Sequence, residues 1–285
     1  MRLFVFGLGY SAQFFLRANA DRFTAVSGTV RSADKVSALG RSLSGVDVLR
    51  FDDLAAVQHC LEATDAILVS VAPAPAVGDP VLKQFGAAIE ASPAERIVYL
   101  STIGVYAGQN GLWVDEDTPP ARGGRSEARI AAESEWLTLG ARSGKLVFVL
   151  RLAGIYGPGS SAIDNVRAGS ARRIVKPGQV FNRIHVADIA GAIAACLSKN
   201  VRGGIFNVCD DEPAPPQDVV VHAAMLIGVE PPPEVAFEAA SLSPMAQQFW
   251  ANNQRVSNRR LRQELGVRLL YPTYREGLAA IAGGS

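Results

Sequence analysis

The chain has 285 residues, of which 48% are hydrophobic and 19% are charged. That balance is typical of a globular protein with a sizeable core and excludes a chain that is disordered throughout. There are 28 Lys and Arg residues against 27 Asp and Glu, a formal net charge of +1. Charge therefore gives no reason to expect nucleic acid or an anionic membrane as a partner.

Cysteine usage and hydropathy favour a cytoplasmic protein. Cys60, Cys196 and Cys209 are odd in number and far apart, so we expect buried, reduced thiols rather than a disulfide framework or a metal site. The first apolar run, at residues 3–6, is too short for the core of a signal peptide, and no run of about 18 apolar residues follows. We expect a cytoplasmic location and no membrane partner.

Short apolar runs alternate with longer amphipathic segments along the first half of the chain. The runs cover residues 3–6, 24–29, 46–51, 66–71, 96–101 and 146–151. The segments between them that fit helices cover residues 11–20, 32–41, 54–63, 81–91 and 125–142. Apolar strands separated by helices predict an α/β fold, a doubly wound parallel sheet of the Rossmann type.

The pattern changes near residue 155, where glycine and proline become frequent and helical segments dominate. We expect residues 1–155 to form a dinucleotide-binding domain and residues 156–285 a small, mainly helical substrate lobe. The lobe is partly interleaved with the first domain, because the apolar stretch at residues 203–209 is a candidate for a strand that returns to the main sheet.

The stretch GLGYSA, residues 7–12, joins the first predicted strand to the first predicted helix. In a dinucleotide-binding turn, Gly7 would make the tight turn, Gly9 would let the backbone approach a pyrophosphate, and Ala12 would allow close packing. Tyr10 and Ser11 begin a helix whose free amides attract phosphate. A plain turn in a protein without a nucleotide is the alternative.

The residues after the second predicted strand indicate whether NAD or NADP is the expected cofactor. An NAD site usually has an acidic residue about 20 positions beyond the glycine turn, but residues 26–32 read VSGTVRS and contain no acid. Arg31, with Thr29 and Ser32 nearby, suits the 2′-phosphate of NADP. We therefore predict NADP rather than NAD. The alternative is that Arg31 is a solvated residue at a helix start.

Two further stretches fit the same cofactor pocket. Asp52 and Asp53 follow the third predicted strand, where a carboxylate is placed to reach the adenine, although Asp53 equally fits a helix cap. Ser70, Val71 and Ala72 end the fourth strand with small side chains, which leave room for the cofactor's ribose.

An ordered series of short motifs runs along nearly the whole chain: GLGYSA at 7–12, YLSTIGVY at 99–106, Glu116 with Pro119-Pro120, RLAGIYGPG at 151–159, RIHVADIA at 183–190, FNV at 206–208, and NRRL at 258–261 with ELG at 264–266. With this series the chain resembles an extended short-chain dehydrogenase/reductase of the NAD-dependent epimerase/dehydratase group. The resemblance implies that Thr102 hydrogen-bonds the reacting hydroxyl or carbonyl. It also implies that Ser101 and Tyr156 lie by the cofactor, and that the loop of His185 faces the substrate.

The chain differs from this family at the two residues that carry out acid/base catalysis in relatives. Relatives carry a Tyr and, four residues later, a Lys that lowers the Tyr pKa and binds the nicotinamide ribose. Here Arg125 and Arg129 stand at those positions, and no Tyr in the chain has Lys four residues on. Arginine stays protonated and cannot replace the Tyr. The chain thus resembles the atypical subset that lacks the Tyr-Lys pair.

Other residues are candidates for the roles that the missing Tyr and Lys have in relatives. Tyr106 and His185 are candidate acid/base groups, each with a structural role as the alternative. Arg129 is a candidate for gripping a ribose or phosphate. Together with Arg125 it forms either an anion site or an ordinary charged helix surface.

The sequence therefore supports two candidate functions of different classes. The first is an NADP-dependent oxidoreductase or epimerase that acts on a small polar, nucleotide-sugar-like molecule with a substituted acid/base. The second is a non-catalytic NADP-binding redox sensor or scaffold. By resemblance, the helices at residues 81–91 and 125–142 are expected to pair in a homodimer.

Overall fold

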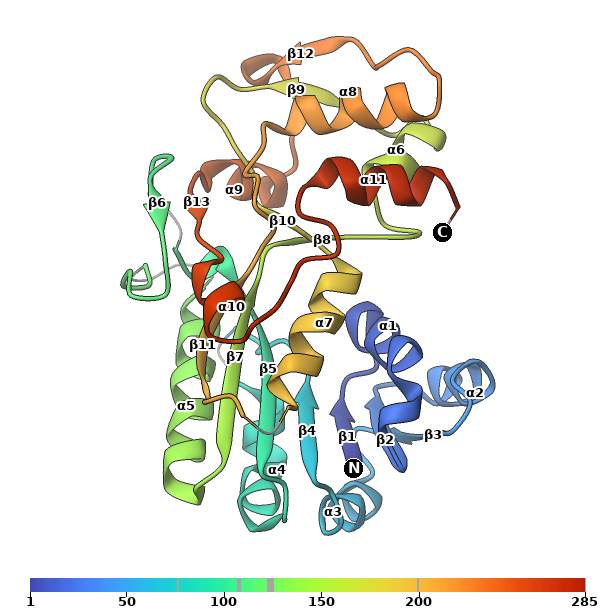
Figure 1. Cartoon of the computed structure of the whole chain (residues 1–285), viewed down its shortest axis with the longest axis vertical. Coiled ribbons are helices and arrows are strands. Elements are labelled where there is room, and N and C mark those ends of the chain that lie inside the picture. Colours follow the sequence, from blue (N-terminus) through green and yellow to red (C-terminus); the bar gives the residue numbers. More distant parts are fainter. Residues whose placement is uncertain (76, 107–108, 122–125, 199, 285) are drawn as a thin grey trace.

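The computed structural model describes residues 1–284 apart from residues 76, 107–108, 122–125 and 199. Its central sheet has seven parallel strands in the order β11-β7-β5-β4-β1-β2-β3 (Figure 1). The strands are β1 (Arg2–Phe6), β2 (Ala25–Val30), β3 (Val46–Arg50), β4 (Ala66–Val69), β5 (Arg96–Thr102), β7 (Leu146–Leu152) and β11 (Gly204–Val208). This topology confirms the predicted doubly wound parallel sheet.

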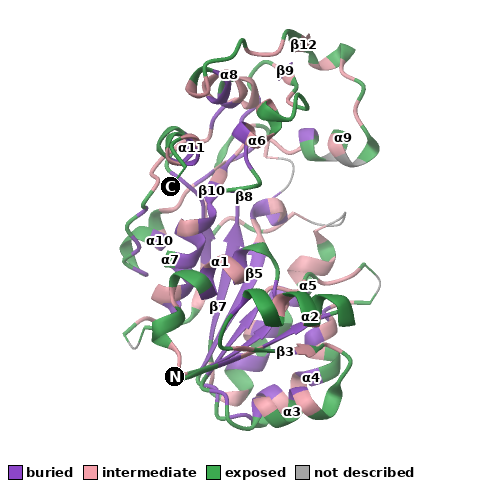
Figure 2. Ribbon diagram, turned by 90° about the vertical axis from the view of Figure 1, so that its right-hand side faces the viewer, coloured by how far each residue is buried: buried purple, intermediate pink, exposed green. Residues whose placement is uncertain are grey.

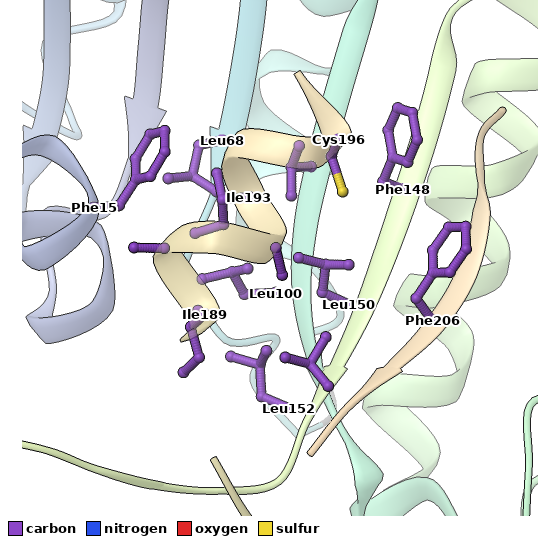
Figure 3. Close-up of a cluster of buried hydrophobic side chains, with 14 of the residues drawn as sticks. Phe15, Leu68, Leu100, Phe148, Leu150, Leu152, Ile189, Ile193, Cys196 and Phe206 are labelled. Carbon is purple, nitrogen blue, oxygen red and sulfur yellow. The ribbon is translucent and has the colours of Figure 1, made fainter. Parts of the chain in front are cut away.

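Helices cover both faces of the sheet, which is why its strands read as continuous apolar runs. One face carries α1 (Tyr10–Ala18), α2 (Ala33–Ser42) and α7 (Val186–Cys196), and the other carries α3 (Leu54–Leu61), α4 (Pro80–Ala91) and α5 (Glu127–Ser143). On the first face, Phe15 of α1 and Ile193 of α7 pack in one buried cluster with Leu68, Leu100 and Leu150 (Figure 3). No helix in the described part of the chain is long and apolar enough to cross a bilayer.

The second half of the chain builds a smaller lobe beyond the carboxyl edge of the sheet (Figures 1 and 2). Its core joins Ile163, Val219 and Leu278. These residues come from α6 (Ala162–Arg167), α8 (Pro216–Leu226) and α11 (Tyr274–Ala282). The remaining elements are β8 (Gly154–Tyr156) paired with β10 (Arg183–His185), β9 (Arg173–Val175) with β12 (Glu234–Ala236), β6 (Trp113–Val114) with β13 (Arg255–Val256), and the helices α9 (Pro244–Ala251) and α10 (Arg259–Gln263). Strand β11 leaves this half of the chain to pair with β7.

A buried carboxylate joins α4 to α5. Asp79 Oδ1 accepts hydrogen bonds from the amides of Val81 at 2.8 Å and Leu82 at 3.2 Å, and so caps α4. Its Oδ2 accepts a hydrogen bond of 2.9 Å from the indole Nε1 of Trp136 in α5. Asp79 is 2% exposed. The two helices are therefore held together by one side chain that satisfies three donors.

His185 closes β10 and begins α7. Its Nδ1 accepts the amide hydrogen of Ala187 at 3.2 Å, so the ring caps the helix. The ring centroid lies 5.1 Å from that of Tyr156 and 4.2 Å from that of Tyr271, and the residue is 3% exposed. Burial lowers the pKa of His185 to about 4. His185 is thus a neutral helix cap inside the protein, whereas the resemblance had implied a loop that faces the substrate.

The role of Asp79 predicts a stability effect. Asp79→Ala removes the cap and leaves the Trp136 indole without its acceptor, so we expect the free energy of unfolding to fall by about 2–4 kcal/mol. Urea unfolding followed by tryptophan fluorescence measures this change. The exposed residue Asp34 supplies the control, because Asp34→Ala should stay within about 0.5 kcal/mol of the parent. Equal effects of the two substitutions would refute the role given to Asp79.

The buried His185 predicts a dependence of stability on pH. Between pH 6.5 and about 4, the unfolded chain binds a proton at this residue while the native ring stays neutral. The free energy of unfolding therefore falls with falling pH, by at most about 1.4 kcal/mol per pH unit from this group. His185→Asn keeps a capping acceptor but cannot titrate, so its urea stability should fall less steeply over this range. His59→Asn, at an exposed position, should follow the parent. A His185→Asn slope identical to the parent slope would contradict the assignment.

Candidate functional site

The turn between β1 and α1 is built against the ends of two neighbouring strands. The amide of Gly7 donates to Thr29 Oγ1 at 3.2 Å, and the amide of Leu8 donates to the Thr29 carbonyl at 3.0 Å. Gly7 has φ of +89°, and a Cβ there would lie 2.9 Å from Val71 Cγ2. A left-handed backbone with no room for a side chain accepts only glycine. Thr29 and Val71 therefore hold the turn in place beside the expected cofactor pocket.

Helix α1 starts without a side-chain cap. Its N-cap is Gly9, which is exposed, and the first turn contains no acidic residue. The amide of Gln13 is bonded to the Gly9 carbonyl at 2.9 Å, so the amides before it have no carbonyl within the helix to bind. A Cβ on Gly9 would meet only Ser70 Oγ, at 3.7 Å. Ser11 and Ala12 are buried behind this surface. An open, uncapped helix start fits a phosphate.

Tyr10 connects the glycine turn to the smaller lobe. Its hydroxyl donates to the carbonyl of Pro158 at 3.0 Å, and 40% of the residue is exposed. A Cβ on Gly157 would lie 2.5 Å from this hydroxyl, so only glycine lets the 157–159 loop approach so closely. The predicted phosphate site is therefore bordered on one side by a loop of the second half of the chain.

The ends of β2 and β4 carry the other predicted cofactor contacts. Arg31 and Ser32 follow β2 and are exposed, and Ser32 Oγ caps α2 by accepting the amide hydrogen of Lys35 at 3.4 Å. Ser70 and Ala72 follow β4 and are at least partly exposed. Their positions at the carboxyl edge leave them available to a cofactor, and their role stays a prediction.

The two aspartates after β3 have partners of their own. Asp52 forms an ion pair with Arg50, and Nε of that arginine lies 2.8 Å from Asp52 Oδ1. Asp53 Oδ1 accepts the amide hydrogen of Ala56 at 3.2 Å and caps α3. Of the two roles considered for Asp53, the structure supports the helix cap.

A buried ion pair organises the ends of β5 and β7. Arg151 Nη2 lies 2.7 Å from Glu133 Oε2, and both side chains are less than 5% exposed. Ser101 Oγ donates to Glu133 Oε1 at 2.5 Å, and Arg151 Nη1 donates to the Tyr106 hydroxyl at 2.7 Å. That hydroxyl donates in turn to Asn207 Oδ1 at 2.9 Å. All of these groups are buried and mutually bonded.

This network bears on two predictions. Tyr106, a candidate acid/base, is 0% exposed, and burial raises the pKa of its hydroxyl. Ser101, a candidate cofactor contact, donates its hydroxyl proton to Glu133. Both hydroxyls therefore have buried partners that stabilise the sheet edge, and the roles of the two residues toward a ligand stay predictions.

Tyr156, which the resemblance places by the cofactor, has its side chain inside the smaller lobe. The residue is 7% exposed, its hydroxyl lies 3.4 Å from the Thr273 carbonyl, and it belongs to the core of the smaller lobe. Burial raises the pKa of this hydroxyl far above its usual value. Its side chain packs against Gly277, where a Cβ would clash with the ring. The side chain of Tyr156 therefore supports the lobe, and the position of this residue by the cofactor stays a prediction.

Three partly exposed side chains gather where β5 ends, and we call them the Thr102 cluster: Thr102, Ser126 and Arg129. Thr102 Oγ1 accepts the amide hydrogen of Gly104 at 3.0 Å. Ser126 Oγ donates to the Gly104 carbonyl at 2.7 Å, and Arg129 Nη1 donates to the Leu100 carbonyl at 2.9 Å. The cluster offers a ligand the Arg129 cation and the hydroxyl proton of Thr102, because the hydroxyl proton of Ser126 is already donated to Gly104. Arg125, the other predicted arginine, lies outside the described residues.

Ser126 was missed by sequence reasoning, which treated it as part of the region around Arg125. A weak signal existed, because Ser126 stands three positions before Arg129 and so shares a helix face with it. In the structure its hydroxyl makes no cap bond and reaches Gly104 instead.

The described part of the chain contains no group of three or more His, Cys, Asp or Glu side chains that could hold a metal ion. A cavity of about 630 Å³ is lined by residues of β6, β13 and α10 and by Asp210 and Asp211. None of its lining residues belongs to the glycine turn or to the Thr102 cluster.

Comparison with known proteins agrees with this architecture. Residues 81–209 match the NAD dependent epimerase/dehydratase family. A 209-residue segment is 31% identical to the 3-diazoavenalumate denitrifying reductase of Streptomyces sp., covering 67% of this chain and 66% of that protein. A 140-residue segment is 34% identical to protein YeeZ of Escherichia coli (strain K12), covering 48% of each. The matches thus span about two thirds and about half of these two relatives.

A solved structure is similar over nearly the full length. The chain superposes on a functionally unknown conserved protein from Silicibacter pomeroyi DSS with a TM-score of 0.87 and 42% identity, covering 99% of this chain and 98% of that one. Together with the sheet order and the glycine turn at the end of β1, these matches identify the family, for which NAD(P) binding is expected. The chain belongs to the NAD-dependent epimerase/dehydratase family.

Proposed function

We propose that the chain is an NADP-dependent oxidoreductase that works as a reductase on a small polar substrate. The observation that carries this proposal is the open start of α1 at Gly9, which a phosphate fits, with the exposed Arg31 at the end of the adjacent strand β2. Two anion-binding features at one sheet edge suit a dinucleotide that bears both a pyrophosphate and a 2′-phosphate.

Each part of the cofactor has residues that fit it. The amides at the start of α1 would hold the pyrophosphate, and Arg31 with Ser32 would hold the 2′-phosphate. Arg129 stands where relatives carry Lys, and the residue is partly exposed, so it would contact a ribose or the substrate. The bound cofactor supplies or accepts a hydride.

The absence of the Tyr-Lys pair favours a reductase over an epimerase. Epimerases of this kind deprotonate a hydroxyl and later return a proton, and a hydroxyl or guanidinium does not remove protons at neutral pH. The similarity to a protein named as a reductase supports the same choice. The proposed substrate class is that of small polar molecules and includes nucleotide-sugar-like ones.

A non-catalytic NADP-binding protein is the second candidate, and the same missing pair favours it. The two candidates differ in one observable. A reductase consumes NADPH in the presence of its acceptor, whereas a sensor or scaffold binds NADPH tightly and leaves it unchanged with every acceptor. The proposed homodimer through α4 and α5 is compatible with both.

The preference for NADP is testable by calorimetric titration with NADPH and NADH. We expect NADPH to bind at least tenfold tighter, and Arg31→Ala to remove that difference, because a charge-assisted hydrogen bond contributes about 1.5–3 kcal/mol. Arg41→Ala, an exposed substitution near the end of α2, the helix that follows Arg31, should leave both affinities unchanged.

Two results would contradict the proposal in different ways. Tight binding of both cofactors by the parent and by Arg31→Ala would leave a dinucleotide site without the NADP preference. No binding of either cofactor would mean that GLGYSA is only a turn, and the oxidoreductase function would fall with it.

A further inference from the structure

The cavity of about 630 Å³ lies apart from the glycine turn and from the Thr102 cluster. Its lining comes from β6, β13 and α10 (Figure 1) and from the two aspartates that follow β11. The volume falls within the range of about 300–1,000 Å³ that small-molecule sites have. Most of the lining side chains are polar or charged, so a ligand that fits this cavity carries polar or charged groups of its own.

Asp210 is the buried acidic residue of this lining. The residue is 2% exposed, and its Oδ1 accepts the amide hydrogen of Glu212 at 3.2 Å. Its Oδ2 has no hydrogen-bond partner among the described residues. A buried carboxylate oxygen without a donor is unfavourable. A donor on a ligand in the cavity would satisfy it.

The other charged residues of the lining differ in whether they have partners. Arg262 Nη1 lies 3.2 Å from Asp211 Oδ1, and Asn258 Nδ2 donates to the same oxygen at 2.7 Å. Arg259 is exposed, and its guanidinium forms no ion pair with the described residues. The lining thus contains one carboxyl group, that of Asp210, and one guanidinium, that of Arg259, without an ion-pair partner in the described part of the chain.

An aromatic side chain borders the same cavity. Trp113 of β6 is 62% exposed, whereas Trp136 and Trp250 are 0% and 8% exposed. No other aromatic ring of the described residues packs on Trp113. An exposed indole offers a flat apolar face to a second ring.

We infer that this cavity binds a free amino acid with an aromatic side chain, with its ammonium on Asp210, its carboxylate on Arg259 and its ring against Trp113. A zwitterion supplies the donor that Asp210 lacks and the anion that Arg259 lacks. An amine without a carboxylate would leave Arg259 unpaired, and an acid without an ammonium would leave Asp210 without a donor. This site does not depend on the proposed function.

Binding of the ammonium should be linked to the ionisation of Asp210. Burial raises the pKa of Asp210 to about 8; the charges of Asp211 and Glu212 act in the same direction, and Arg183 of β10 acts against them. Tyr156 of β8 also lies near, and burial keeps its hydroxyl neutral. Without a ligand at pH 7 the Asp210 carboxyl is therefore mostly protonated. Because an ammonium favours the carboxylate, its binding should release about one proton.

The first test compares three probes that share one ring. L-phenylalanine is the zwitterion, 2-phenylethylamine lacks its carboxylate, and 3-phenylpropanoate lacks its ammonium. In calorimetric titrations of the full chain, L-phenylalanine should bind at least tenfold tighter than either of the others. The emission of Trp113 should change on binding, and Trp113→Phe should abolish that change. Equal affinity of L-phenylalanine and either analogue, or no binding of L-phenylalanine, would overturn the inference.

The second test removes each charged partner. Asp210→Asn and Arg259→Ala should each weaken L-phenylalanine binding at least tenfold. Arg268→Ala is the matched control, because Arg268 is exposed and does not line the cavity, and it should bind as the parent does. Arg259 is exposed, so its substitution gives an answer even if Asp210→Asn fails to fold. Equal binding by Arg259→Ala and Arg268→Ala would overturn the site.

The third test counts protons. Calorimetry of L-phenylalanine binding at pH 7, in phosphate and in Tris, measures the protons released, because the two buffers differ in their heats of ionisation. We expect about one proton per bound ligand for the parent and none for Asp210→Asn. The absence of proton release by the parent, or an equal release by Asp210→Asn, would contradict the placement of the ammonium on Asp210.

Discussion

The buried ion pair between Arg151 and Glu133 is the contact on which the candidate site depends. It joins β7 to α5 at the carboxyl edge of the sheet, and both side chains are almost completely buried. Such a pair is stable only when its remaining hydrogen-bonding groups are satisfied, and losing one partner costs about 3–5 kcal/mol. Here Ser101 and Tyr106 supply the additional bonds.

The same ion pair sets the orientation of α5. Ser126, Arg129 and Glu133 stand at positions i, i+3 and i+7, so they share one face of the helix. Anchoring Glu133 on Arg151 turns this face toward β5, where Ser126 and Arg129 reach backbone carbonyls.

The fold and the glycine turn could be predicted from sequence because their determinants are local. Each apolar run was long enough to mark a strand buried on both faces, and GLGYSA directly followed the first of them. The structure moves strand and helix ends by only a few residues relative to those runs. It also shows why Gly7 must be glycine, since Val71 leaves no room for a Cβ.

The roles of several polar residues could not be predicted, because their partners are distant in sequence. Tyr106 meets Asn207, which is 101 positions away. Tyr156 packs beside Gly277, and the burial of His185 depends on Tyr271. A motif match reports where such a residue stands in a family, whereas its burial and bonding depend on the tertiary packing of this chain. Ser126 was missed because the predicted helix at residues 125–142 included it, whereas in the structure it precedes α5 and reaches the Gly104 carbonyl.

The most direct measurement is the crystal structure of the protein with NADP⁺. It would test whether the glycine turn and Arg31 form one cofactor site. The account predicts the pyrophosphate on the amides at the start of α1 and the 2′-phosphate against Arg31. A cofactor bound with its 2′-phosphate away from Arg31 would contradict the account.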